Sequence, residues 1–193
     1  MSSIMCKTGI GVVAAFAMAA GTAQADDLLI IDLTVANEIT ITATDGLSAV
    51  TASGSDGIGI YLENFYGGSG DALSAPLASG DFTNAENPAD GSPALFRGGG
   101  GSDPGLNIWS FSSDGTVTFT EGSLAFVGSA TWSLDANEYA DMLAGSMSGN
   151  IYFPADTVDD IAGASLLGTY TVVPAPGVVA LLGLAGLARS RRR

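Results

Sequence analysis

The 193-residue chain contains no histidine, and its single cysteine and single lysine are Cys6 and Lys7, both close to the N-terminus. Triads and dyads built on His or Cys, Schiff-base lysines, zinc sites and disulfides therefore lack their side chains. The sequence predicts a protein that is not an enzyme. Glycoside hydrolysis on two carboxylates is the one alternative that the composition readily permits; Glu63 lies near aromatic residues, but no spacing selects a pair.

Positive charge is almost absent from the middle of the chain. All 20 acidic residues lie between Asp26 and Asp160, where Arg97 is the only cation, and the whole chain has a net charge of −14. Nucleic acid is excluded as a partner, because phosphate binding needs Lys and Arg. We expect Arg97 to pair with one of the many carboxylates, and the alternative is that it holds an anionic ligand.

The N-terminus has the three parts of a secretory signal. Lys7 precedes an apolar run over residues 9–20, and the small residues Ala23 and Ala25 stand at positions −3 and −1 of a cleavage site before Asp26. Residues 1–25 are therefore predicted to be a helical signal peptide that signal peptidase removes. A buried N-terminal helix is the alternative.

The C-terminus combines prolines, an apolar stretch and a basic cluster. A helix from Gly177 to Ala188 would span about 18 Å, which is shorter than the ~30 Å hydrocarbon core of a membrane. The basic residues that follow would stay in the cytoplasm and leave the acidic body outside. These residues, which form the membrane stop, are Arg189, Arg191, Arg192 and Arg193. A plain membrane anchor and a core helix with a basic tail are the alternatives.

This arrangement over residues 172–193 resembles the PEP-CTERM sorting signal of Gram-negative bacteria in its Pro-Ala-Pro variant. The motif residues are Pro174, Ala175, Pro176 and Gly177. The resemblance implies transient insertion of the C-terminal helix in the inner membrane, processing by an exosortase, and transfer to the cell surface or extracellular matrix. It also implies a structural or adhesive role, with extracellular polysaccharide as a partner.

The passenger, residues 26–171, alternates β-branched and aromatic residues with polar ones and is broken by Asp-Gly turns. This pattern predicts an all-β fold, namely a single antiparallel, jelly-roll-like β-sandwich. The expected strands are 28–35, 38–44, 48–52, 59–65, 106–112, 116–120, 124–134, 149–153 and 167–173, with short ones near 80–82 and 94–97. Asp114-Gly115 is expected to close a hairpin between 106–112 and 116–120.

One short helix is predicted near residues 135–144. Asp135 and Glu138 have the spacing of a capping box, Tyr139, Met142 and Leu143 share one face, and Gly145 would end the helix.

Two kinds of binding site remain as alternatives to a purely structural role. Calcium prefers oxygen ligands, and the densest acidic group is Asp156, Asp159 and Asp160. The stretch Gly98–Asp103 also matches the first part of a calcium-binding nonapeptide, although the match then fails at Gly105. No other cofactor is expected. Trp109 and Trp132 are the rings that a sugar would contact, but their alternating positions favour core packing for each.

Overall fold

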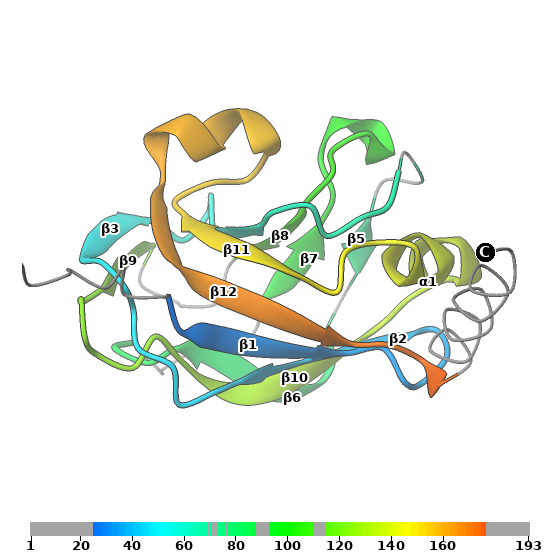
Figure 1. Ribbon diagram of the computed structural model, residues 1–193, viewed down its shortest axis with the longest axis horizontal. Helices are drawn as coiled ribbons and strands as arrows, with labels where there is room; N and C mark the ends of the chain where they lie inside the picture. The colour runs from blue at the N-terminus through cyan, green and yellow to red at the C-terminus, as the bar shows by residue number, and fades with distance from the viewer. Residues whose placement is uncertain are drawn as a thin grey trace, which may run out of the picture.

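The structure is a computed structural model that describes residues 25–68, 70, 73–75, 77–87, 93–109 and 115–176. β-Strands are the main secondary structure of these residues (Figure 1), which confirms the all-β prediction. The predicted signal helix and the apolar C-terminal helix with its arginines lie outside the described residues. Within the described ranges, no helix is both long and apolar enough to cross a membrane.

Ten strands form one large curled sheet, and two more form a separate pair. In spatial order the large sheet contains β5 (Ser74–Ala75), β7 (Ala94–Phe96), β8 (Leu106–Trp109), β4 (Ile60–Leu62), β11 (Ser148–Phe153), β12 (Ser165–Val173), β1 (Asp27–Asp32), β2 (Glu38–Ala43), β10 (Phe126–Ser133) and β6 (Leu77–Asn84). The pair consists of β3 (Ala52–Ser55) and β9 (Thr116–Phe119).

The sheet is mixed, so the prediction of a purely antiparallel fold is wrong at one place. Figure 1 shows β1 in blue and β12 in orange side by side and running in the same direction, and their register pairs Asp32 with Val173. Alternation along a strand shows which face is buried but not which strand lies beside it. The parallel pairing of the first and last strands therefore could not be inferred from the pattern.

The core lies inside the curl of the sheet. Phe119 of β9 contacts both Phe126 of β10 and Phe153 of β11, with ring centroids 5.2 and 5.0 Å apart. β10 and β11 are separated by three strands in the sheet, so one ring can touch both only because the sheet curls around it. Trp132 is fully buried and donates from Nε1 to the Pro93 carbonyl at 3.1 Å, which confirms the prediction of core packing for this residue.

All but one of the nine main predicted strands are present, with shifted ends. The exception is 48–52, where only an isolated bridge joins Leu47 and Leu124 and the strand begins at Ala52. Ser48 folds back locally, because its hydroxyl donates to the Val50 carbonyl at 2.7 Å. Such short-range side-chain bonds compete with a strand ladder. The two short strands expected near 80–82 and 94–97 are confirmed as β6 and β7.

The predicted hairpin around Asp114-Gly115 is wrong. β9 pairs with β3, whereas β8 lies between β7 and β4. Asn107 holds β8 in that place: its buried amide donates to the carbonyls of Ile58, Ile60 and Ala155 at 2.7 to 3.1 Å. These distant contacts outweigh the local turn signal.

The helix prediction is confirmed. α1 spans Ala136–Leu143, and Asp135 caps it by accepting from the backbone N–H groups of Asn137 and Glu138 at 2.8 and 2.9 Å. Glu138 completes the box by accepting from the Asp135 N–H at 2.8 Å. Two 3-10 turns, η1 (Gly99–Gly101) and η2 (Val158–Gly163), complete the helical elements of the described chain.

Candidate functional site

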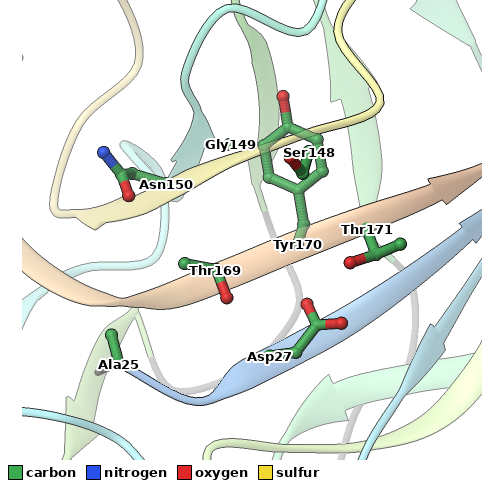
Figure 2. Close-up of a pocket in the computed structure, with 8 residues that line it drawn as sticks. All are labelled: Ala25, Asp27, Ser148, Gly149, Asn150, Thr169, Tyr170 and Thr171. Carbon is green, nitrogen blue, oxygen red and sulfur yellow. The ribbon is translucent and has the colours of Figure 1, made fainter. Parts of the chain in front are cut away.

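A polar groove of about 420 Å³ crosses the outer side of three central strands, β11, β12 and β1 (Figure 2). Most of the side chains that line it are short and polar; the lining residues are Ala25, Asp27, Ser148, Gly149, Asn150, Thr169, Tyr170 and Thr171. Ala25 precedes the predicted cleavage point, so the other seven residues would form the groove of the processed protein. The groove is larger than two other hollows in the described chain, which have volumes of about 180 and 250 Å³.

Strand register brings these residues together. Ser148 lies opposite Thr171, and Asn150 lies opposite Thr169, which in turn lies opposite Asp27 on the other side of β12. Because side chains alternate between the two faces of a strand, these pairs form one polar row across three strands, Asn150–Thr169–Asp27, and a shorter one across two, Ser148–Thr171, which ends against the exposed Ile30 of β1. The rows come from the start and the end of the passenger, so only tertiary pairing creates them.

Gly149 and Tyr170 form the floor between the rows. Tyr170 is fully buried, and its hydroxyl donates to the Glu63 carbonyl at 2.7 Å. A Cβ at position 149 would stand 2.5 Å from that carbonyl oxygen and 2.7 Å from the Tyr170 ring, so only glycine fits here. Burial, followed by the nearby Glu63 charge, raises the pKa of Tyr170 far above its ordinary value. The floor is therefore rigid and uncharged.

A second polar cluster adjoins the groove along β11. The Asn150 amide nitrogen donates to a Glu63 carboxylate oxygen at 2.9 Å and lies 3.4 Å from the Tyr152 hydroxyl. These bonds orient the amide, with its nitrogen committed to Glu63. Tyr152 shares the outer face of β11 with Ser148 and Asn150, and it is partly exposed. The groove and this cluster thus combine hydroxyls, an oriented amide, two carboxylates and a partly exposed tyrosine.

The structure brings together two of the three aspartates that were considered for calcium. Asp156 and Asp160 share a hydrogen bond, and Asp160 also accepts from the N–H and hydroxyl of Thr157 at 3.2 and 2.8 Å. Asp159 is exposed. Within the described ranges, no group of three or more His, Cys, Asp or Glu side chains is placed to hold a metal ion.

The Asp156–Asp160 pair predicts a pH-dependent stability. The hydrogen bond to Asp160, then burial, raises the pKa of Asp156, while the same bond and those from Thr157 lower the pKa of Asp160. A raised pKa means that the stabilisation from Asp156 is present at low pH and lost as the pH rises through the folded-state pKa. Once Asp156 has lost that proton, the two neighbouring carboxylates repel each other.

Asp156→Asn is therefore expected to stabilise the protein at pH 7 by roughly 0.5 to 1 kcal/mol, the size of an exposed charge pair. The amide can donate to Asp160 at every pH, so the gain should be smaller at pH 4 than at pH 7, because the pKa of Asp156 in the natural protein is raised. Thermal unfolding at both pH values measures this, with Asp159→Asn as the exposed control. A gain no larger than that of the control, or equal at both pH values, would contradict the shared proton.

Asp103, in the glycine-rich stretch, is held by three donors. Its carboxylate accepts from the Tyr61 hydroxyl at 2.5 Å, the Gly105 N–H at 2.8 Å and the Val158 N–H at 3.0 Å. Burial and the bond to Asp103 raise the pKa of Tyr61 far above its ordinary value, so Tyr61 remains a donor. The glycine-rich stretch is thereby joined to β4 and to η2.

Arg97 is buried and pairs with a carboxylate, which confirms that prediction. Its guanidinium lies 3.2 Å from Asp141, donates from Nε to the Asp103 carbonyl at 3.0 Å and donates to the Gly68 carbonyl. It also stacks over the Tyr66 ring at 3.8 Å from the centroid. These contacts make Arg97 a structural residue that joins α1 to two loops, with no side exposed for an anionic ligand.

The predicted processing sites adjoin strands at both ends. Asp26 is bound through its carbonyl, which accepts from the N–H and hydroxyl of Thr169 at 2.8 and 3.1 Å. At the other end the Val173 carbonyl accepts from the Leu33 N–H at 2.9 Å. The boundary expected between residues 171 and 172 therefore lies inside β12, and Pro174–Pro176 follow directly. Ala23, Gly177 and the four arginines lie outside the described residues.

Sequence reasoning did not find the groove. The alternations Ser148-x-Asn150-x-Tyr152 and Thr169-x-Thr171 indicate outward polar faces, but nothing in them shows that the faces are adjacent. The sequence suggests its two tryptophans as the rings that a sugar would contact, but Trp132 lies in the core. Comparison with protein-family models, curated proteins and solved structures finds no match to this chain.

Proposed function

We propose that this chain is an exported protein of the cell surface or extracellular matrix, sorted by its C-terminal segment and structural or adhesive, not catalytic, in its role. One observation carries the proposal: the strands begin at Asp27, just after the predicted signal cleavage, and end at Val173, just before the Pro-Ala-Pro motif. Removal of both ends would leave every strand whole. This is the arrangement expected of a passenger between two targeting segments.

The proposed route follows from the ends. Signal peptidase cuts before Asp26, and the short apolar segment 178–188 holds the chain in the inner membrane of a Gram-negative bacterium until an exosortase processes it. The arginines remain in the cytoplasm during this step. We also propose that the curled sheet closes into two facing layers, as a sandwich does, and the contacts of Phe119 with both β10 and β11 support this.

The experiment replaces both prolines of the motif. In the native host, the unchanged protein is expected at the surface or in the medium, shorter than its precursor. Pro174→Ala with Pro176→Ala is expected to accumulate as a longer, membrane-bound form, and deletion of the host's exosortase gene should have the same effect. Fractionation and intact-mass measurement follow both.

The matched control is Pro104→Ala, a proline in a loop of the passenger whose carbonyl accepts from the Tyr66 N–H at 2.9 Å. It should be processed and exported as the unchanged protein is. Full-length, uncut protein in the cytosol, or normal processing of the double-proline variant, would contradict the proposal.

A further inference from the structure

We infer that the groove across β11, β12 and β1 binds an uncharged oligosaccharide segment of a polysaccharide. This inference rests on the proposed function, because it names the class of ligand that a protein of the cell surface or matrix would bind. It goes beyond that function by assigning a site to particular residues.

The polar rows match the surface of a sugar. Ser148 and Thr171 are exposed and lie opposite each other, and hydroxyls both donate and accept. Thr169 donates its hydroxyl proton to the Asp26 carbonyl, so the same oxygen is left to accept. Asp27 is exposed and can accept from two neighbouring ligand hydroxyls. Donors and acceptors that alternate at such short spacing complement a ligand that carries many hydroxyls on rigid rings, as an oligosaccharide does.

The aromatic ring of Tyr152 extends the groove along β11. It lies two residues from Asn150 on the same strand face, and the 3.4 Å approach of the Asn150 amide to its hydroxyl places the two side chains together. A tyrosine ring offers a flat apolar face and a polar tip. Sugar rings carry C–H groups on one face and hydroxyls at the rim, so they complement both parts.

The charge around the groove selects against acidic sugars. Asp27 lies in the lining, and Glu63 is bound to Asn150 at its edge. The protein as a whole carries a net charge of −14. A uronate or a phosphate in the groove would be repelled by this field, whereas an uncharged sugar would not.

The site is also preorganised. The polar side chains that line the groove stand on strands, the Asn150 amide is oriented by Glu63, and the floor is fixed by the packing of Tyr170 under Gly149. Groups that are already held in place lose little freedom on binding. The groove is open to solvent, so we expect weak affinity, with a Kd on the order of 0.1 to 1 mM.

The test is titration calorimetry on the purified full chain in mild detergent. The probes are cellotetraose, laminaritetraose, maltotetraose and mannotetraose, with tetragalacturonate as the acidic probe. The groove is filled by Ser148→Gln with Thr171→Gln, both exposed. The matched control is Ser55→Gln with Thr116→Gln, an exposed pair that also lies opposite across antiparallel strands, β3 and β9.

We expect at least one of the uncharged tetrasaccharides to bind, the groove-filled variant to lose tenfold or more in affinity, and the control to stay within twofold. Heat from none of the four at 10 mM, equal affinity of the two variants, or tighter binding of tetragalacturonate would overturn the inference. Thermal unfolding of each variant shows that the fold is kept. Export and sorting are judged separately by fractionation, so a failure here leaves the proposed function standing.

Discussion

Replacing Arg97 with methionine is expected to destabilise the fold by about 3 kcal/mol, the cost of removing one partner from a buried, hydrogen-bonded ion pair. Methionine fills much of the volume but cannot donate. The carbonyls of Asp103 and Gly68 would lose their donor, and Tyr66 would lose the cation over its ring. The free energy of unfolding from urea titration measures the loss.

Two further variants separate the contributions at this site. Arg97→Lys keeps the charge, but a single ammonium cannot reach three acceptors in the directions of a guanidinium, so about half of the loss should remain. Asp141→Asn should cost about 1 kcal/mol or less, because the Asp141 side chain is 30% exposed and water can replace its partner. If Arg97→Met cost less than 1 kcal/mol, Arg97 would not be the structural link described above.

Removal of β12 is expected to abolish folding altogether. A chain that ends at Ala164 lacks the strand that pairs with both β11 and β1, and it also lacks the buried side chains of Leu167, Tyr170 and Val172. Each such side chain contributes about 1.5 to 3 kcal/mol, and together with the lost strand pairing this approaches the whole stability of a typical domain. Circular dichroism should show no cooperative unfolding.

A chain that ends at Val173 is the control, and it should unfold cooperatively within about 1 kcal/mol of a chain that ends at Pro176. The last strand bond, from the Leu33 N–H to the Val173 carbonyl, is present in both. Folding without β12 would contradict the strand order. If the expected result holds, a sorting protease that leaves the passenger folded must cut after Val173.

Some elements could be predicted from residues that are close together in the sequence. Asp135 and Glu138 specified α1 because a capping box needs only residues three apart. Alternation placed most strands, since the side-chain period of two is set by the backbone itself. The burial of Trp132 followed from its place in such an alternation.

Long-range pairing decided the rest. The Asp114-Gly115 signal was overruled by the Asn107 amide, which binds three carbonyls that are distant in the sequence. The groove likewise depends on a last strand lying parallel to a first one. Neither feature leaves a local trace, because hydrogen bonds between strands use backbone groups that every residue carries.

By itself the sequence determined the all-β class, the capped helix, the scarcity of cations and the expectation of targeting segments at both ends, since each depends on composition or on neighbours a few residues apart. Only the tertiary structure decided which strands lie side by side, that Arg97 is enclosed by Asp141, Asp103 and Gly68, and that Asp27 faces Asn150 across β12. The physical reason is that burial and strand pairing are collective: a side chain is enclosed, or a groove is formed, by residues that the chain brings together only when the whole sheet has closed.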